Sequence, residues 1–386
     1  MSNKKIAVDS TVLLKEICGV ADSRILSDLR SLIEAEAVTR LKKAEYTVCD
    51  GYCHAGEFGI DLIGETAAVP QTLPDGRYLP EGVKKVLRGD VAALLSLDSN
   101  GYPRRAAATS GLINLKPTYG TVSRYGTVPV VSSADTVGIT AKSVDTCRDI
   151  LNTISGSNEK DPTVSMLTMG EQAPIRCVGI PREMTRKAST ETRQEFIKLL
   201  SALERNGIRV LEIPEEKCNL FAVAHTVWNT VLCAEAWGNL SRYDGVRYGN
   251  RADGCTTPDE IYTASRSEGF GELVKATVLY GSYALSPDSD GGLFFKVSAI
   301  RNSVKEATDE LFAQFDGILI PACSVPFYTV ENIKTEGFTA FSENLYTAFA
   351  SICGLPAVTV NGIQIIGNTF SDRKLLDLAE KLEICS

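Results

Sequence analysis

Apolar residues recur along the chain at spacings that predict alternating helices and strands. Residues 27–45 carry apolar side chains near the helical repeat, namely Leu29, Leu32, Ile33, Val38 and Leu41. Residues 46–49 follow as a short apolar run that is typical of a strand. We therefore expect a helix and then a strand in this part of the chain.

A second helix is predicted by agreement between its start, its apolar face and its end. Ser143 is a good N-cap, Asp145 suits the first turn, and Gly156 stands just past the end. The apolar face is formed by Val144, Cys147, Ile150, Leu151 and Ile154.

A strand-helix-strand unit is predicted next. The strands are 177–181 and 208–213, and the helix between them ends at Gly207. Its apolar face carries Phe196, Leu199, Leu200 and Leu203. Such units normally make right-handed crossovers within a parallel sheet.

Further strands are expected at 317–320 and 363–366, and a closing helix after Ser371 with Leu375, Leu376, Ala379 and Leu382 buried. No long Pro/Gly/Ser linker separates these elements. We expect one large α/β unit with a mixed, mostly parallel central sheet and helices on both faces.

Composition narrows the function classes. The 386 residues are 44% hydrophobic and 23% charged, with a net charge of −8. Direct nucleic-acid binding is not expected, because it needs concentrated Lys and Arg. No apolar run reaches the roughly 18 residues that a membrane span needs. We expect a cytoplasmic protein.

Metal and cofactor sites are not expected. The 11 cysteines show no paired spacing typical of zinc sites or disulfides, and only Cys49, Cys53 and His54 stand close together. We interpret these cysteines as buried thiols. Phosphate-cradling loops and the GxSxG nucleophile motif are absent from the sequence.

The most informative stretch is 98–126, DSNGYPRRAAATSGLINLKPTYGTVSRYG. It resembles the amidase signature, in which a DTGGSIR-type loop leads into GLKPTYGRVSRYG. The run from Lys116 to Gly126 matches this pattern except at Thr121, and Ser132, Ser133 and Asp135 continue it. The resemblance implies the α/β fold of the amidase signature family.

Further segments resemble one branch of that family, the A subunits of glutamyl-tRNA(Gln)/aspartyl-tRNA(Asn) amidotransferases. Residues 234–249 are similar to AEASSNLARYDGVRYG, and 266–272 repeat RSEGFGE. Residues 354–357 and 364–367 repeat GLPA and QIIG.

The resemblance implies a catalytic triad of a nucleophilic serine, a bridging serine and a neutral lysine base. The matching positions here carry Tyr102, Lys84 (or the adjacent Val83) and Asp9. Lys15 reaches the lysine position only if a gap is introduced. Because a phenol cannot replace the nucleophile and the base is absent, we expect no catalytic residues and a degenerate triad.

The remaining site positions are also altered. Asp98, Ser99, Asn100 and Gly101 match the family's oxyanion loop, and we interpret them as vestigial, with N–H donors from Asn100 and Gly101. The family's KRRI segment reads KATV here, so Ala276 or Thr277 replaces an arginine that would bind a carboxylate. Tyr248 belongs to the same altered substrate pocket.

The sequence therefore favours a divergent A-subunit-like protein, with residues 1–386 forming one amidase-like domain that lacks much of the family's N-terminal helical segment. We expect a non-catalytic pseudo-amidase with a binding or structural role in or near the tRNA-dependent amidotransferase complex, and so in translation. The expected partners are the B and C subunits or a paralogous A subunit. Two alternatives remain open: an active amidase or glutaminase with a rearranged site, and a small-molecule sensor.

Overall fold

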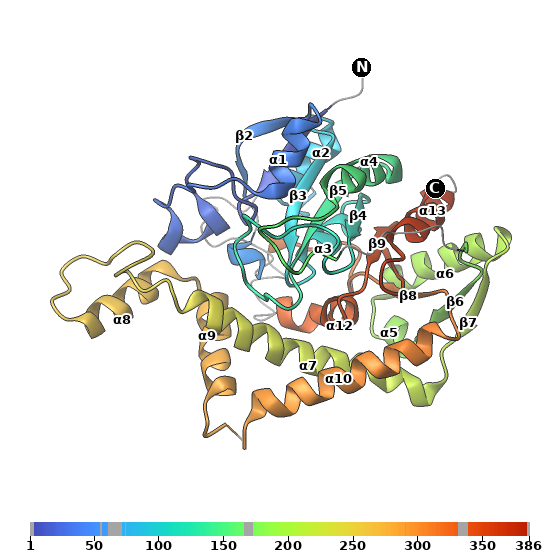
Figure 1. The fold of residues 1–386 in the computed structure, drawn as a ribbon. Helices are drawn as coiled ribbons and strands as arrows, with labels where there is room; N and C mark the ends of the chain where they lie inside the picture. Colours follow the sequence, from blue (N-terminus) through green and yellow to red (C-terminus); the bar gives the residue numbers. More distant parts are fainter. Residues whose placement is uncertain are drawn as a thin grey trace.

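A computed structural model describes residues 4–54, 56–60, 72–73, 75–165, 173–289, 291–330 and 339–383. Within these residues a single sheet of ten strands runs through the molecule in the order β2-β1-β3-β5-β4-β9-β10-β8-β6-β7 (Figure 1). The strands are β1 (Lys5–Asp9), β2 (Thr47–Cys53), β3 (Ala93–Asp98), β4 (Ile113–Lys116), β5 (Thr136–Ala141), β6 (Cys177–Ile180), β7 (Arg209–Glu212), β8 (Gly317–Pro321), β9 (Ala357–Val360) and β10 (Ile363–Ile366).

Helices account for most of the remaining described chain. They are α1 (Glu36–Lys43), α2 (Glu81–Arg88), α3 (Tyr102–Ala108), α4 (Val144–Ile154), α5 (Arg182–Arg186), α6 (Thr190–Arg205), α7 (Glu215–Leu240), α8 (Pro258–Gly269), α9 (Glu272–Leu285), α10 (Leu293–Phe312), α12 (Thr339–Ile352) and α13 (Asp372–Glu383). Short 3-10 turns stand at Val20–Asp22, Arg24–Leu26 and Glu57–Gly59.

The sheet is mixed, but the expectation that it is mostly parallel is wrong. Strands β2, β1 and β3 are parallel to one another, as are β8, β6 and β7. The pairings between these two groups, through β5, β4, β9 and β10, are all antiparallel. The strand-helix-strand pattern indicated the parallel part correctly. Only two residues connect β9 to β10, which permits only antiparallel pairing there, whereas the other antiparallel pairs of the middle are joined by longer connections.

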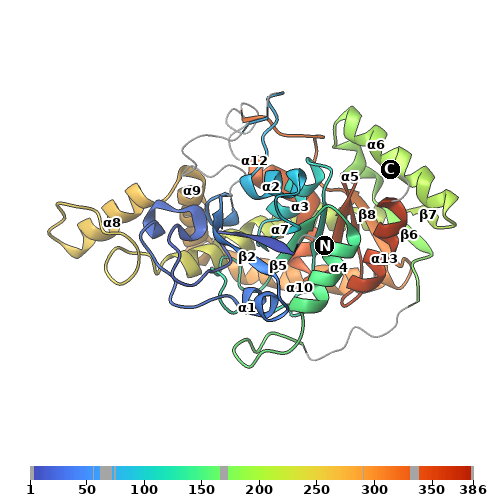
Figure 2. The ribbon, with the colours of Figure 1, turned by 90° about the horizontal axis from the view of Figure 1, so that it is seen from above.

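Helices cover both faces of the sheet, as expected (Figure 2). Alternate strand residues point to opposite faces, so Ala93 and Leu95 join one buried cluster while Leu94 joins another. The first cluster is covered by α1, α4, α6 and α13. On the opposite face α2 and α3 lie against the β1–β3 end, and α7, α10 and α12 surround a third cluster that includes β8.

Several predicted elements are confirmed closely. Helix α4 begins after Ser143, whose hydroxyl accepts a hydrogen bond from the Thr146 N–H, and its five expected apolar residues are all buried. The predicted strands at 177–181, 208–213, 317–320 and 363–366 correspond to β6, β7, β8 and β10. The closing helix is α13, with its expected apolar residues buried.

The helix predicted over residues 27–45 is shorter than expected, because α1 begins only at Glu36. The preceding backbone is bonded to another loop instead: the Glu16 N–H donates to the Ser31 carbonyl, and the Ala35 N–H donates to the Leu13 carbonyl. Leu32, which the pattern placed on the apolar face, is 79% exposed.

Helix α7 is the longest described helix, with 26 residues, and α8 projects from the body beside its C-terminal end (Figure 1). Among the described residues no helix is long and apolar enough to cross a membrane.

Candidate functional site

The segment that resembles the amidase loop lies at the carboxyl end of β3. The sequence resemblance indicates a loop in this stretch, but helix α3 begins at Tyr102, so residues 93–116 form strand β3, helix α3 and strand β4 in turn. Gly101 precedes the helix in the left-handed conformation (φ 71°), and a Cβ there would lie 2.4 Å from the Thr347 Cβ. Pro103 lies in the first turn of the helix, where its missing N–H costs nothing.

A buried ion pair holds this loop. Arg104 Nε and Nη2 donate to the two carboxylate oxygens of Asp98 at 2.8 and 3.0 Å, and both side chains are fully buried. Arg104 Nη1 donates to Gln364 and to the Thr347 carbonyl. Although burial alone would raise the pKa of Asp98, Arg104 holds it below its usual value.

One of the two N–H groups expected as oxyanion donors is engaged within the loop. The Gly101 N–H donates to Asp98 Oδ1 at 3.1 Å, so the expectation that it is a free donor is wrong. The Asn100 side chain donates to the Ile60 carbonyl and accepts from the Trp228 indole. Ser99 is fully buried beside them. These contacts make the loop a structural tie between β3 and its surroundings.

Tyr102 occupies the position that the alignment assigns to the nucleophilic serine. Its side chain is only 3% exposed, and its hydroxyl has no hydrogen-bond partner among the described residues. Burial raises the pKa of its phenol well above the usual value, and the charges of Tyr78 and Asp9 act in the same direction. At ordinary pH this group is a neutral phenol.

Asp9 ends β1 at the same edge of the sheet. Its carboxylate accepts hydrogen bonds from the Thr11 N–H and from the Ser10 and Thr11 hydroxyls. Burial raises its pKa to about 7, and the nearby Asp22 adds to the increase. Asp22 in turn bonds to His54 Nδ1 at 2.7 Å. The structure thus brings an acid, rather than a lysine, close to Tyr102.

The bridging-serine position falls on α2. Val83 packs in the same buried cluster as Tyr102, whereas Lys84 is only partly buried. Burial lowers the pKa of Lys84, and the neighbouring Arg88 adds to the decrease. Part of the serine-free stretch 67–95 lies outside the described residues.

Lys116 is the fully buried lysine nearest in sequence to this site. Its Nζ donates to the Leu355 carbonyl at 3.0 Å and to the Pro117 carbonyl at 3.4 Å. Burial lowers its pKa to about 8. The Tyr119 hydroxyl donates to the Ser132 carbonyl. Lys116 and Tyr119 therefore hold the surrounding backbone through hydrogen bonds.

The altered pocket positions are separated in the structure. Ala276 on α9 lines an apolar cavity of about 300 Å³ together with Asn229, Cys233, Tyr280 and Phe341. Thr277 is buried, and its hydroxyl donates to the Leu273 carbonyl. Tyr248 is 57% exposed in the connection between α7 and α8, and it does not line this cavity.

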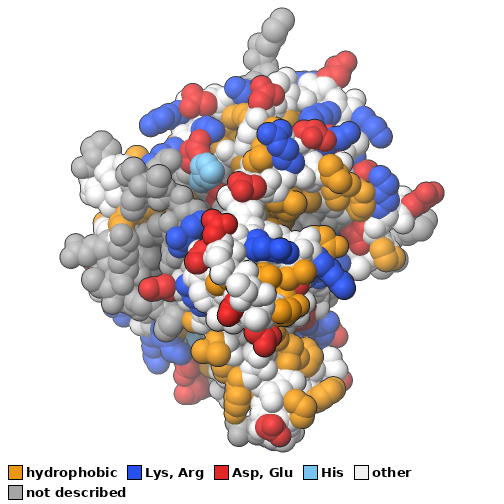
Figure 3. Space-filling view, turned by 90° about the vertical axis from the view of Figure 1, so that its left-hand side faces the viewer, with side chains coloured by type: hydrophobic (Ala, Val, Ile, Leu, Met, Phe, Trp, Pro, Cys, Tyr) orange, Lys and Arg blue, Asp and Glu red, His pale blue; other side chains and the backbone are white. Residues whose placement is uncertain are grey.

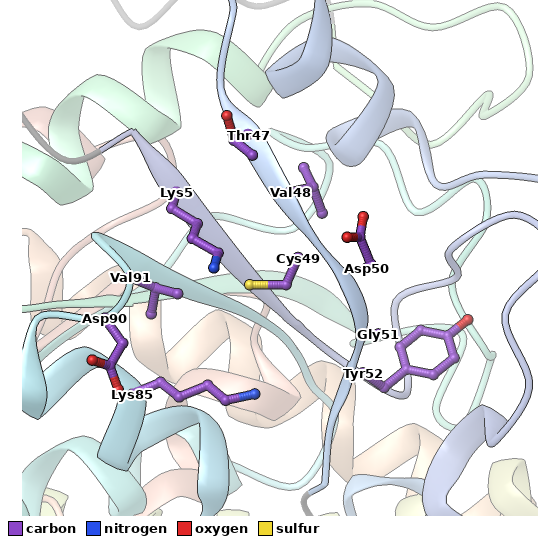
Figure 4. A pocket seen from close by; sticks show the side chains of 10 residues that line it. All are labelled: Lys5, Thr47, Val48, Cys49, Asp50, Gly51, Tyr52, Lys85, Asp90 and Val91. Atoms are coloured by element: carbon purple, nitrogen blue, oxygen red, sulfur yellow. The ribbon is translucent and has the colours of Figure 1, made fainter.

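Another cavity, of about 450 Å³, lies at the β2 edge of the sheet, where the side chains of Lys5 and Cys49 point toward each other (Figure 4). Lys85, on its rim, pairs with Glu81 at 2.7 Å and approaches Cys53 Sγ at 3.5 Å. Burial raises the pKa of the Cys53 thiol to about 12, which fits the expected buried thiol.

Sequence reasoning missed one charged residue of this region, Arg105. It directly follows Arg104 on α3 and is fully buried. Its Nη1 donates to Asn344 Oδ1 at 3.0 Å and to the Thr347 hydroxyl at 3.2 Å. The sequence does contain a signal for it, because Arg104 and Arg105 are the only charged residues of the helix Tyr102–Ala108. Adjacent helix residues point in different directions, so the two arginines contact different partners.

The sheet, the Asp98–Gly101 loop and the buried segment around Lys116 together define the class of protein. The chain belongs to the amidase family, because the sequence model of that family matches residues 98–376.

Within that family the chain is similar to glutamyl-tRNA(Gln) amidotransferase A subunits. It is 29% identical to the protein of Listeria monocytogenes serotype 4b over 408 residues, covering 99% of this chain and 83% of the relative. It is 30% identical to the A subunit of Listeria innocua over 403 residues, which cover 98% of this chain and 82% of that relative.

Solved structures agree on the fold. The crystal structure of the Thermotoga maritima A subunit superposes with a TM-score of 0.76 at 25% identity, over 98% of this chain and 82% of that chain. Kluyveromyces lactis allophanate hydrolase, at 21% identity, shares the fold with a TM-score of 0.78 over 98% and 61%.

Proposed function

We propose that the chain is a non-catalytic member of the amidase family, related to amidotransferase A subunits, that acts by binding. The observation that carries the proposal is Tyr102: a buried, neutral phenol stands where the alignment assigns the nucleophilic serine. A neutral phenol with a strongly raised pKa is a poor nucleophile.

The lack of a lysine base at the expected position supports the same proposal. Asp9 stands where the alignment assigns the lysine, and Lys116 donates to two backbone carbonyls. A working base must lie within hydrogen-bond reach of the nucleophile. No hydrogen bond joins a serine hydroxyl to a lysine amine in the described part of the site.

Amide hydrolysis by a rearranged site is the second candidate function. It is favoured by the pKa of Lys116, about 8, which would leave part of this lysine neutral near pH 7. Ser99, buried in the adjacent loop, would be the nucleophile. This candidate requires Lys116 to leave its carbonyl partners.

Ammonia release from glutamine and asparagine tests the proposal. The purified protein and the Tyr102→Ser variant are both expected to release no ammonia above a heat-denatured sample, because restoring one member of a triad does not restore the others. A commercial glutaminase serves as the positive control. Activity in the unmodified protein that is lost in Tyr102→Ala or Ser99→Ala would overturn the proposal in favour of the second candidate.

The proposed binding partners are the amidotransferase B and C subunits or a paralogous A subunit, which would give the chain a role in or near tRNA-dependent amidation in the cytoplasm. The support is the similarity to proteins named as subunits. We also propose that residues 1–386 act as one amidase-like domain. One sheet takes strands from β1 through β10, which supports a single domain.

A further inference from the structure

A cavity of about 300 Å³ opens between α7, α9 and the start of α12, and we call it the α7–α9 cavity. Asn229 and Cys233 line it from α7, Ala276 and Tyr280 from α9, and Phe341 from α12. Each of the first two pairs is four residues apart, so its members share one face of their helix. Two of the five side chains are aromatic, and Ala276 contributes only a methyl group. The recess between the three helices therefore has room for a small molecule.

The side-chain amide of Asn229, at the wall of the cavity, is already held by the protein. Its Oδ1 accepts a hydrogen bond from Asn344 Nδ2 at 2.8 Å, and its Nδ2 donates to the Phe341 carbonyl at 3.3 Å. His225 Nε2 lies 2.8 Å from the same carbonyl. Asn344 in turn accepts from Arg105 at 3.0 Å, so the amide is one link in a chain of hydrogen bonds from α7 to α3. Its main role is therefore to connect these helices.

The other polar groups at the wall are neutral. The Tyr280 hydroxyl shares a hydrogen bond with the Thr230 hydroxyl at 3.2 Å. Burial raises the pKa of the Cys233 thiol to about 12, so this group carries no charge at ordinary pH. None of the described residues that line the cavity is charged. A charged ligand would lose hydration there without gaining an ionic partner.

The size and the walls of the cavity limit the ligand further. An apolar cavity of about 150 Å³ holds benzene, so about twice that volume has room for one or two fused rings. Tyr280 and Phe341 favour a flat ring, because offset-stacked and edge-to-face ring contacts add to the gain from burying apolar area.

We infer that the α7–α9 cavity binds a small neutral aromatic molecule. The inference deepens the proposed binding function by naming a class of ligand, and it rests on that function. The residues at the altered pocket positions support it. The family resemblance implies an arginine for a carboxylate at Ala276 or Thr277, and neither residue is charged here. The ligand is bound and released without a change in its bonds.

Calorimetric titration and thermal unfolding of the full chain with indole test this site. Indole at about 100 times its dissociation constant is expected to raise the Tm by a few degrees. Indole-3-acetate adds a carboxylate to the same ring system and is expected to bind about 10-fold or more weakly. Glutamine and succinate are expected to leave the Tm unchanged relative to sodium chloride at matched ionic strength.

Substitution of Ala276 assigns the response to this cavity. Ala276→Leu places a larger side chain in it and is expected to weaken indole binding about 10-fold or more. Because leucine is a good helix former and fills empty space, the ligand-free Tm should be unchanged or higher. Lys275→Leu adds the same side chain at the neighbouring exposed position of α9, outside the cavity, and should bind indole as the unmodified protein does.

Tyr280→Ala covers the case in which Ala276→Leu fails to fold. It removes one ring from the wall and is expected to weaken indole binding about 3-fold or more. The inference is overturned if indole neither binds nor raises the Tm, or if indole-3-acetate binds as tightly as indole. It is also overturned if indole binds equally to the unmodified protein and to whichever of these two variants folds.

The ammonia assay on the same preparations keeps the two proposals distinguishable. Indole binding without ammonia release supports both. Glutamine hydrolysis by the unmodified protein would overturn the proposed function whether or not indole binds. The absence of both indole binding and hydrolysis would overturn only the α7–α9 cavity as a binding site.

Discussion

Asp9 shows how replacing a lysine by an acid changes the energetics of the site. The side chain is 2% exposed, and the hydroxyls and the N–H around it compensate only part of the cost of burying a charge. Its pKa of about 7 in the folded protein lies above the value of 3.8 that the unfolded chain would have. The folded state therefore holds this proton more tightly than the unfolded state does.

This pKa difference predicts a pH-dependent loss of stability. Asp9 stabilises the folded state fully below about pH 4, and that contribution is lost as the pH rises to about 7. Relative to Asp9→Asn, the unmodified protein should lose roughly 1.4 kcal/mol of unfolding free energy per pH unit within that window. Urea unfolding of both proteins at several pH values between 4 and 8 measures the difference.

A matched control is Asp75→Asn, at an exposed position paired with Arg77. The difference in unfolding free energy between Asp75→Asn and the unmodified protein should not decrease between pH 4 and pH 7. If the difference in unfolding free energy between Asp9→Asn and the unmodified protein is constant from pH 4 to 8, then Asp9 does not bind its proton more tightly in the folded state than in the unfolded state.

At the scale of elements, two glycines in neighbouring helices predict opposite effects of the same substitution. A Cβ at Gly281 on α9 would lie 2.0 Å from the backbone carbonyl oxygen of Cys233 on α7, so the helices would have to separate. A Cβ at Gly238 on α7 meets nothing within 4 Å. Gly281→Ala should destabilise the protein by about 1–3 kcal/mol, and Gly238→Ala should stabilise it by about 0.5–1 kcal/mol.

Urea unfolding of the two variants measures both effects. If Gly281→Ala were as stable as the unmodified protein, the close crossing of α7 and α9 would be wrong. A loss of stability in Gly238→Ala would instead indicate contacts on that side of α7.

Elements with complete local signals could be predicted from the sequence, and those determined by distant contacts could not. Helix α4 has its cap, its apolar face and its terminating glycine in the sequence, and it was predicted within a residue. Residues 27–35 have apolar spacing, but their backbone pairs with residues 13–16, which no local pattern reveals. The antiparallel middle of the sheet was missed because strand direction depends on the connections rather than on the strands.

The site was predictable to the same degree. The sequence indicated that Tyr102 and Asp9 stand at the degenerate positions, and the structure brings them to one edge of the sheet. It did not indicate that the Gly101 N–H donates to Asp98, because that contact depends on the turn of the loop. It did not indicate that Arg105 is buried, because its partner Asn344 lies on the distant helix α12.

At the scale of the whole molecule, α9 and α10 leave large apolar side chains exposed. They are Leu279, Tyr280, Tyr283 and Leu285 on α9, and Phe295 and Ile300 on α10, and we call them the α9–α10 surface. Hydrophobic side chains gather toward the lower end of the molecule in Figure 3, the end at which Figure 1 places these helices. Exposed apolar groups of this kind mark interfaces more often than single scattered residues do. This surface is the best candidate on the described chain for contact with another subunit.

The α9–α10 surface yields a prediction about assembly. Leu279 and Phe295 are 74% and 81% exposed, so Leu279→Lys with Phe295→Lys should change the unfolding free energy by no more than about 0.5 kcal/mol. If these residues are central to a subunit interface, burying two lysines there should weaken co-purified complexes with the B and C subunits about 10-fold or more. Ile197→Lys on α6, at a position 59% exposed, is the matched control and should leave binding unchanged.

Analytical size-exclusion chromatography of co-expressed subunits, followed by calorimetric titration, measures the effect on binding, and urea unfolding measures the effect on stability. Equal binding by the double variant and the unmodified protein would remove this surface as the interface, and failure of the unmodified protein to bind either subunit would remove the B and C subunits as partners.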